Sequence, residues 1–303
     1  MGYRSLGVKD PLSATVADAI RPTSSEVQWA ISVHCDGIPV VAINHGALLR
    51  TASMGKVFLL AEVARRMESG DLDAGVILDA AGIEPVKDSG LWQHFTDVPL
   101  TVSAAAVLVA AVSDNLATNA LLAQVGLASV QEMSASLGMP DSRILDRIRD
   151  HRTADDPSDP SVGRSHDLAR FMHLLGAADQ SADGWLTQVR RWLALGVDLS
   201  MVASALSLDP LAHAAVPPGL FNKTGADFGV RADAGFLTVA EQQWSYAVIA
   251  NWRTTGDVGG DAAMAAVVLV TMRRIGEALW ASANSRSRHG NSDEVSGGCD
   301  RLH

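Results

Sequence analysis

Apolar and polar positions in the first part of the chain predict a short helix, a hairpin and a buried helix. Residues 10–22 carry a short helical pattern. Residues 27–44 form two apolar runs separated by Asp36-Gly37, a pair typical of the turn between antiparallel strands. Over 53–70 the apolar positions recur at helical spacing, and nearly all of the first half is apolar. We therefore expect this last helix to be buried.

The rest of the chain predicts a helical middle, then strands and a closing helix. Residues 100–200 are mostly helical in pattern, most clearly at 102–112, 116–125 and 165–175. Residues 141–164 are rich in Asp, Arg, Pro and Ser and predict a long irregular loop, which in a compact domain is usually functional. The last third predicts three strands, at 219–224, 229–238 and 244–252, followed by an apolar helix at 260–283. The polar tail, 285–303, is expected to be disordered.

This order of elements predicts an α+β fold. Strands from both ends of the chain would form one antiparallel sheet flanked by helices, and the helices of the middle would form a separate lobe. The expected sheet lobe is 1–50 with 205–284, and the expected helical lobe is 51–204. We expect the functional site in the crevice between the two lobes.

Charge and cysteine content narrow the classes of function. The formal net charge of −10 argues against a nucleic-acid partner, because phosphate binding needs a cationic surface. No basic cluster borders an amphipathic helix, so a membrane partner is not expected either. Of the two cysteines, Cys35 is expected to be a buried thiol and Cys299 a tail thiol, although a disulfide between them also fits the count. They form no metal-ligand spacing.

The N-terminal residues lack the apolar segment of a secretory signal. No run of about 18 apolar residues is long enough to span a bilayer. The sequence as written therefore predicts a cytoplasmic protein, or a secreted one if a signal peptide has been removed.

The first candidate for chemistry is the Ser-x-x-Lys pair of Ser53 and Lys56, at the start of the predicted buried helix. Residues three apart share a helix face, so the Lys56 amine can reach the Ser53 hydroxyl. A serine nucleophile needs a neighbouring base, and lysine serves only if its pKa is lowered. The spacing also fits a capping serine and an exposed lysine. However, Lys56 is the only charge between Arg50 and Glu62, in a run that otherwise favours burial.

Two further motifs carry polar groups that chemistry could use. Ser113-Asp114-Asn115 opens an apolar helical segment, where Ser and Asp are also common helix caps. Ser113 could relay a proton to a leaving nitrogen, and Asn115 could hold a substrate amide. The other motif is the Lys-Thr-Gly-Ala run at 223–226, in a predicted strand. Its lysine and hydroxyl could bind a carboxylate, and its backbone N–H groups could meet an extended substrate.

The three motifs in this order, about 60 and about 110 residues apart, resemble the signature of class A β-lactamases and penicillin-binding proteins. The resemblance spans roughly 27–283. It implies that Ser53 is acylated and that Lys56 is its general base. It also implies that Ser113 relays a proton and that Asn115 contacts the substrate amide. Lys223 and Thr224, followed by Gly225, would bind a carboxylate. The backbone N–H groups of Ser53 and Ala226 would form the oxyanion hole. Arg231 would add positive charge for a substrate carboxylate. No metal or organic cofactor is implied.

One departure from the family concerns the long loop. Class A enzymes carry a loop glutamate, shortly after a Leu-Asp-Arg segment, that activates the deacylating water. Here Leu-Asp-Arg stands at 145–147, but Arg149 occupies the position of the glutamate. Asp150 or His151 could serve as the deacylation base, or both could be solvated loop residues.

Trp92 could shape the substrate site or belong to the core.

These features predict a serine hydrolase that forms an acyl-enzyme with a small-molecule amide or ester. The first substrate class to expect is a β-lactam or a related small cyclic amide. Three alternatives stay open. One is an esterase or small-amide hydrolase without β-lactamase activity. The second is a β-lactam-binding protein that is acylated but does not hydrolyse. The third is a D-alanyl-D-alanine peptidase.

Overall fold

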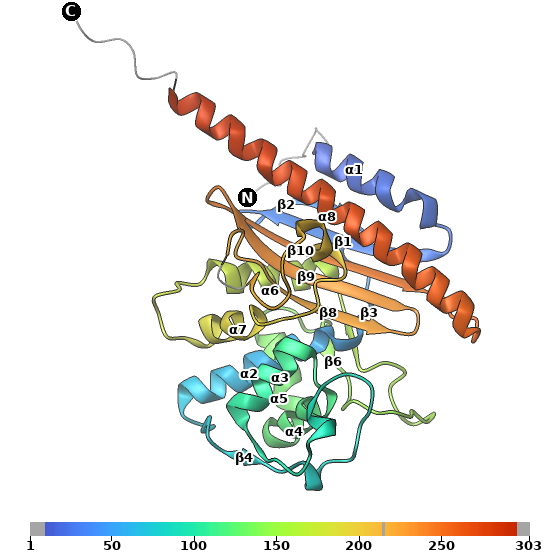
Figure 1. The fold of residues 1–303 in the computed structure, drawn as a ribbon, viewed down its shortest axis with the longest axis vertical. Coiled ribbons are helices and arrows are strands. Elements are labelled where there is room, and N and C mark those ends of the chain that lie inside the picture. Colours follow the sequence, from blue (N-terminus) through green and yellow to red (C-terminus); the bar gives the residue numbers. More distant parts are fainter. Residues whose placement is uncertain (1–9, 214–215, 296–303) are drawn as a thin grey trace, which may run out of the picture.

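A five-stranded antiparallel sheet forms the centre of an α+β fold (Figure 1). The computed structural model describes residues 10–213 and 216–295. The strand order is β2-β1-β10-β9-β8. The bounds are β1 (Val27–Cys35), β2 (Ile38–Ile43), β8 (Phe221–Asp227), β9 (Val230–Val239) and β10 (Gln242–Trp252). Both ends of the chain thus contribute to one sheet, which confirms the predicted fold class.

The predicted hairpin forms between β1 and β2. Asp36 and Gly37 connect the strands with φ values of 50° and 76°, and a two-residue turn with two positive φ values matches the twist of the flanking strands. Asp and Gly tolerate this conformation better than other residues, so the turn follows from the local sequence.

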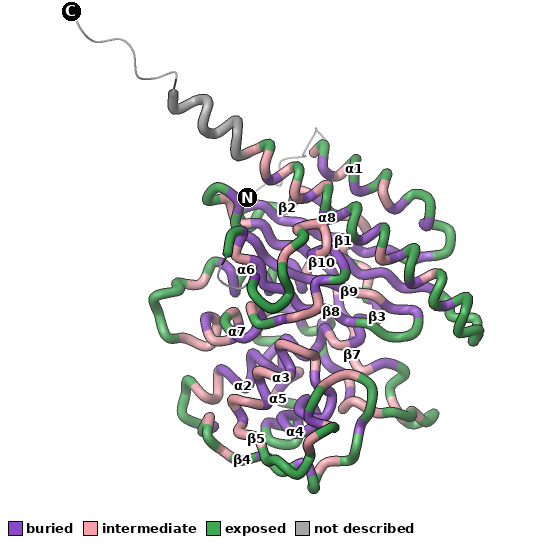
Figure 2. The backbone as a smooth tube through the Cα atoms, in the orientation of Figure 1, coloured by how far each residue is buried: buried purple, intermediate pink, exposed green. Residues whose placement is uncertain are grey.

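Helices cover both faces of the sheet (Figure 1). On one face lie α1 (Pro11–Ile20) and α8 (Val258–Val295), and on the other lies α6 (Ser165–Ala177). Alternating side chains of a strand point to opposite faces, and two apolar clusters result. On β1, for example, Trp29 and Ile31 join the cluster of α1 and α8, whereas Ala30 joins the other. β1, β8, β9 and β10 are accordingly buried along most of their length, whereas the edge strand β2 is mostly exposed or half-buried (Figure 2).

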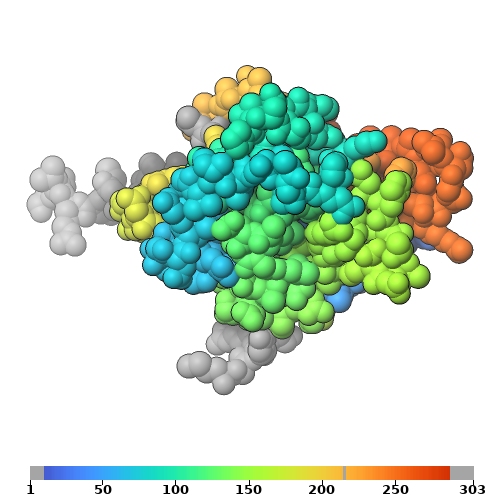
Figure 3. Space-filling view, turned by 90° about the horizontal axis from the view of Figure 1, so that it is seen from below, coloured from blue at the N-terminus to red at the C-terminus, as the bar shows by residue number. Residues whose placement is uncertain are grey.

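The helical lobe is built around α2 (Lys56–Ser69), whose residues 56–64 are all buried. Its neighbours are α3 (Val102–Val112), α4 (Asn115–Val125), α5 (Leu127–Ser136) and α7 (Trp185–Leu193). The α2 helix ends at Gly70, which takes a left-handed φ of 78°. Seen from below, the end of the lobe is covered mainly by the cyan to yellow-green middle of the chain (Figure 3).

Short strand pairs connect these layers: β3 (Leu49–Arg50), β4 (Ile77–Leu78), β5 (Leu100–Thr101), β6 (Arg143–Ile144) and β7 (Ser161–Gly163). β6 pairs with β7 and β7 with β3, so both ends of the predicted loop 141–164 are anchored next to the start of α2. The division into lobes at residues 50 and 205 stays a prediction, and α6, within the expected helical lobe, packs on the sheet.

The prediction for the tail was wrong in part. α8 continues to Val295, so residues 285–295 are helical. No proline interrupts this segment, and the polar residues there are compatible with a helix that is already nucleated. Residues 296–303, including Cys299, lie outside the described part, and Cys35 is a buried free thiol. Across 10–213 and 216–295, no helix has the length and apolar character needed to cross a membrane.

Candidate active site

A cavity of about 1030 Å³ lies where the helical lobe meets the edge strand β8. Its wall is formed by the segment before α2, the segment 86–89, the connection from α3 to α4, the loop 148–160, the segment 196–198 and β8. Eight of the predicted site residues line it: Ser53, Ser113, Asn115, Asp150, His151, Lys223, Thr224 and Ala226. Three motifs that are far apart in the sequence therefore meet at one cavity.

Ser53 lies in a short 3₁₀ turn, Ala52–Gly55, that leads directly into α2. Ala52 has a φ of 49°, in the left-handed region, which costs a non-glycine residue about 1 to 2 kcal/mol. Such strain is common at functional sites, where surrounding packing maintains it. The turn leaves Ser53 half-buried at the cavity wall, while Met54 and Gly55 are buried behind it.

β8 approaches the backbone at Ser53 very closely. A Cβ atom on Gly225 would lie 2.2 Å from the Thr51 carbonyl oxygen and 3.1 Å from the Ser53 nitrogen. Real Cβ atoms essentially never come within 3.0 Å of another atom, so only glycine allows this approach. The motif glycine thus brings β8, with Ala226 next in sequence, against the turn that carries Ser53.

The Ser113 hydroxyl lies between the side-chain nitrogens of two lysines. Ser113 ends α3 with a left-handed φ of 57°. Its Oγ is 3.2 Å from the Lys56 Nζ and 3.0 Å from the Lys223 Nζ. Lys56 also donates to the Ser113 carbonyl oxygen at 2.7 Å and to Asn115 Oδ1 at 2.8 Å. The two lysines of the predicted site are therefore connected through one hydroxyl.

Both lysines are buried, and burial is the main cause of their lowered pKa values. The pKa of Lys56 falls well below its usual value because burial disfavours the ammonium, and the charge of Lys223 lowers it further. Burial lowers the pKa of Lys223 to about 8, while Asp198 and Asp233 oppose the shift. Burial and the charge of Lys223 therefore both favour the neutral amine of Lys56 over its ammonium form.

Asp114 connects the second motif to the segment 87–92. It caps α4 by accepting from Ala117 N at 2.8 Å, and its other oxygen accepts from Leu91 N and Trp92 N at 2.6 and 2.8 Å. The Asn115 side-chain amide also donates to the Lys87 carbonyl oxygen at 3.2 Å. These bonds fix the segment that forms one side of the cavity.

Trp92 belongs to the core and does not line the cavity, so the idea that it shapes the substrate site was wrong. It is fully buried, and its Nε1 donates to the Val98 carbonyl oxygen at 2.9 Å. The hydrogen bonds from Leu91 N and Trp92 N to Asp114 hold the backbone at this position. Arg231 is likewise absent from the wall. It donates to the carbonyl oxygens of Asp227 and Val230, and its guanidinium lies over the Trp252 ring.

Asp198 is a wall residue that the sequence patterns did not reveal. Its Oδ2 accepts a 2.6 Å hydrogen bond from the Thr224 hydroxyl. Its other oxygen accepts from Ser200 N at 3.1 Å and Ser200 Oγ at 2.6 Å. Burial raises the pKa of Asp198, but the bonds from Ser200 and Thr224 and the charge of Lys223 outweigh burial and lower it overall. No motif contains Asp198, and its partner lies 26 residues away, so local sequence held no signal for it.

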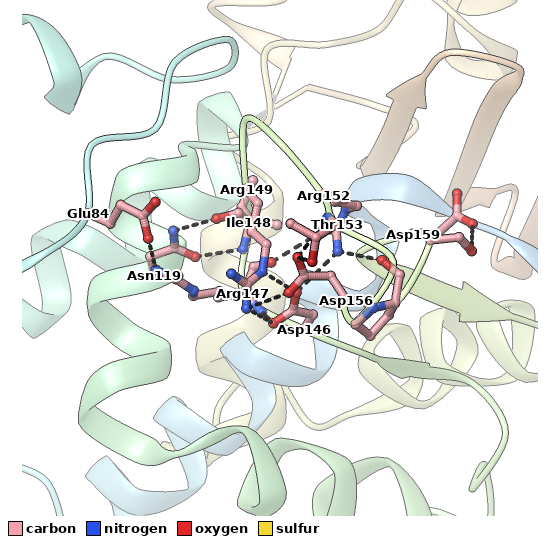
Figure 4. Close-up of polar contacts among 12 residues, drawn as sticks. Glu84, Asn119, Asp146, Arg147, Ile148, Arg149, Arg152, Thr153, Asp156 and Asp159 are labelled. Carbon is pink, nitrogen blue, oxygen red and sulfur yellow. Dashed lines mark hydrogen bonds and ion pairs between the residues drawn. The ribbon is translucent and has the colours of Figure 1, made fainter.

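The loop over the cavity is held by an ion-pair network (Figure 4). Asp146 pairs with Arg149 at 2.6 Å and with Arg152 at 3.1 Å, and Arg149 also pairs with Asp156. The Asn119 side chain both donates to and accepts from the Ile148 backbone, at 2.9 and 2.8 Å. Arg149, which the sequence resemblance predicts at the position of the family glutamate, pairs with two carboxylates of the loop.

Asp150 and His151 both line the cavity and are exposed to solvent. Asp150 Oδ1 accepts from Lys87 N at 2.9 Å, which connects the loop to the opposite segment of the wall. In the described part of the chain, no three His, Cys, Asp or Glu side chains are arranged to hold a metal ion.

Solved structures with the same fold include three close matches in shape. A β-lactamase from Sphaerobacter thermophilus has a TM-score of 0.71 and 24% identity, covering 90% of this chain and 96% of that one. A mutant of PBP-A in an acyl-enzyme complex with penicillin G has a TM-score of 0.69 and 17% identity, and the match covers 92% of this chain and 100% of that one. A β-lactamase from Xanthomonas campestris has a TM-score of 0.70 and 16% identity, and the match covers 91% of this chain and 98% of that one. No curated protein matches the sequence.

The sequence itself matches the model of the β-lactamase enzyme family over residues 11–281. This range includes the sheet, the helical lobe and all three motifs. The chain belongs to the β-lactamase enzyme family.

Proposed function

We propose that the protein is a serine hydrolase that opens small amides or esters through an acyl-enzyme at Ser53, with β-lactam-type rings as the first substrates to test. The observation that carries this proposal is the position of the Ser113 hydroxyl within hydrogen-bond distance of both Lys56 and Lys223, in the cavity that the half-buried Ser53 also lines. Family membership supports the same reaction class.

In the proposed acylation step, Ser53 Oγ attacks the substrate carbonyl carbon and its proton passes to the neutral amine of Lys56. The lowered pKa of Lys56 supports this role, because a protonated lysine cannot accept that proton. The backbone N–H groups of Ser53 and Ala226 would stabilise the oxyanion, consistent with the close approach of β8 at Gly225.

Collapse of the tetrahedral intermediate breaks the bond to the leaving group. The leaving nitrogen or oxygen takes its proton from the Ser113 hydroxyl, which is replenished from Lys56. Lys223 would remain charged and hold Ser113 in place. Water then gives a proton to a base and attacks the acyl carbon on Ser53. The bond to Ser53 Oγ breaks, Ser53 Oγ takes up the proton, and the carboxylic acid product leaves the free enzyme. Asp150 is the proposed base for this water because it is a carboxylate on the cavity wall.

The test compares the wild type with Ser53→Ala on a chromogenic cephalosporin, following colour and intact mass over time. We expect the wild type to gain the mass of the acyl group and to release it slowly, and the variant to lose at least about a thousandfold in acylation. An adduct that persists would support acylation without efficient hydrolysis. If neither the cephalosporin nor an activated aryl ester acylates the wild type, or if Ser53→Ala reacts equally, the proposal is wrong.

A further inference from the structure

The side of the cavity beside Lys223 and Thr224 contains a built-in carboxylate. The family resemblance implies that this pair binds the carboxylate of a substrate, yet the Thr224 hydroxyl is 2.6 Å from Asp198 Oδ2. A hydroxyl has a single proton to donate, so the hydrogen bond to Asp198 leaves Thr224 only lone pairs for a substrate.

Asp198 is fixed in this position by its neighbours. The preceding Val197 N donates to the Ala111 carbonyl oxygen at 3.0 Å, and the Asp198 carbonyl oxygen accepts from Asn222 Nδ2 at 3.2 Å. The segment also packs closely at Gly196, where a Cβ would lie 3.1 Å from the Leu193 carbonyl oxygen at the end of α7. The carboxylate is therefore part of the wall and not a mobile surface group.

The charges of this region also disfavour an anion. Lys223 is the cation nearest to Thr224, and two of its donors are already directed to Ser113 Oγ and to the Thr224 carbonyl oxygen. Asp198 offsets its charge. Arg231, the other expected cation, donates to two backbone carbonyls and does not line the cavity.

We propose that Asp198 makes the Lys223–Thr224 subsite selective for leaving groups that are uncharged or cationic at this position, and unfavourable for leaving groups that carry a carboxylate there. This inference rests on the proposed Ser53 acyl-enzyme and narrows its substrate class. The favoured substrates are neutral or amine-bearing small esters and amides, since a carbamoyl or ammonium N–H can donate to Thr224 and Asp198. β-Lactams with a ring carboxylate are then poor substrates.

The experiment uses three aryl esters of one N-acylglycine that differ only in the leaving group: 3-carbamoylphenyl, 3-(aminomethyl)phenyl and 3-carboxyphenyl. The second-order acylation constant of the wild type is measured for each by release of the phenol and by intact mass. We expect the carbamoyl and aminomethyl esters to react at least tenfold faster than the carboxyl ester. Each constant is corrected for the intrinsic reactivity of the ester towards hydroxide.

The matched variants are Asp198→Asn and Asp227→Asn. Both residues line the cavity, and each substitution removes one negative charge. Only Asp198 contacts Thr224, whereas Asp227 accepts from the backbone N of Phe228. We expect Asp198→Asn to reduce the preference against the carboxyl ester at least fivefold, and Asp227→Asn to change it less than twofold. Thermal unfolding checks that both variants are folded.

The outcomes separate the two proposals. A wild type that reacts with the carboxyl ester as fast as with the carbamoyl ester contradicts the role of Asp198, but leaves the Ser53 acyl-enzyme intact. Equal effects of the two variants on the preference would also overturn the inference. Only the absence of a Ser53 adduct with all three esters and with the cephalosporin alike would overturn the proposed function.

Discussion

At the scale of single residues, Lys223 sets the expected alkaline limit of acylation. Its pKa of about 8 means that it loses its charge just above neutral pH, and with it a strong donor to Ser113. We predict that the acylation rate falls as the pH rises through about 8. In Lys223→Arg, whose guanidinium stays protonated, this fall should move to higher pH even if the maximal rate is lower. Stopped-flow acylation between pH 5 and 10 measures both profiles, and an alkaline limit that stays near 8 in the variant would contradict the assignment.

Asp150 carries the residue-scale prediction for deacylation. Asp150→Asn retains an oxygen that can accept from Lys87 N, so the loop should keep its position. Because the amide cannot accept a proton from water, we expect the lifetime of the acyl-enzyme to increase at least tenfold while acylation stays within about twofold. His151→Gln, also on the wall, is the matched control and should change the lifetime little. Intact mass after a pulse of acylating ester gives the lifetimes, and equal lifetimes in wild type and Asp150→Asn would exclude Asp150 as the base.

At the scale of elements, the contact between β8 and the turn at Ser53 is the feature most sensitive to substitution. In Gly225→Ala the new Cβ would overlap the Thr51 carbonyl oxygen, so β8 or the turn must move. We expect a loss of about 1 to 3 kcal/mol in the free energy of unfolding and a loss of at least about a hundredfold in acylation. Gly82→Ala is the control, because a Cβ there meets nothing within 4 Å. Urea unfolding and acylation rates test both variants, and near-normal acylation by Gly225→Ala would show that the close approach is dispensable.

Elements with a strong local pattern could be predicted from the sequence, whereas several features that depend on distant contacts could not. The Asp36-Gly37 turn and the end of α2 at Gly70 follow from local backbone preferences. The position of Trp92 depends on hydrogen bonds to Asp114, 22 residues away, and the wall position of Asp198 depends on Thr224. The order of predicted strands and helices was enough to predict the fold. The charges around the site, by contrast, could be assessed only from the three-dimensional arrangement.

At the scale of the whole molecule, a group of three histidines, of which His34 is buried and His45 and His166 are half-buried, connects the β1–β2 hairpin to α6. The rings of His34 and His166 are 5.8 Å apart, those of His45 and His166 are 5.3 Å apart, and Ser32 Oγ lies 3.1 Å from His34 Nε2. Burial lowers the pKa of His34 to about 4, and the charge of His166 contributes in the same direction. The fold therefore holds His34 in its neutral form, between a strand of the central sheet and the helix that covers it.

This group predicts that the protein loses stability in mild acid. The pKa of His34 is about 4 in the folded protein and 6.5 when unfolded, so between these values the unfolded chain binds more protons. Its contribution is complete above pH 6.5 and falls as the pH decreases towards 4, by about 2 to 3 kcal/mol for this residue. Urea unfolding at pH 7.5, 6 and 4.5 should show the loss, and His34→Gln, which carries no titrating ring, should reduce it. His94→Gln, at an exposed position, is the control and should behave as the wild type. If His34→Gln and the wild type lose the same stability on acidification, the acid sensitivity comes from other groups, and the interface between the hairpin and α6 does not depend on a neutral His34.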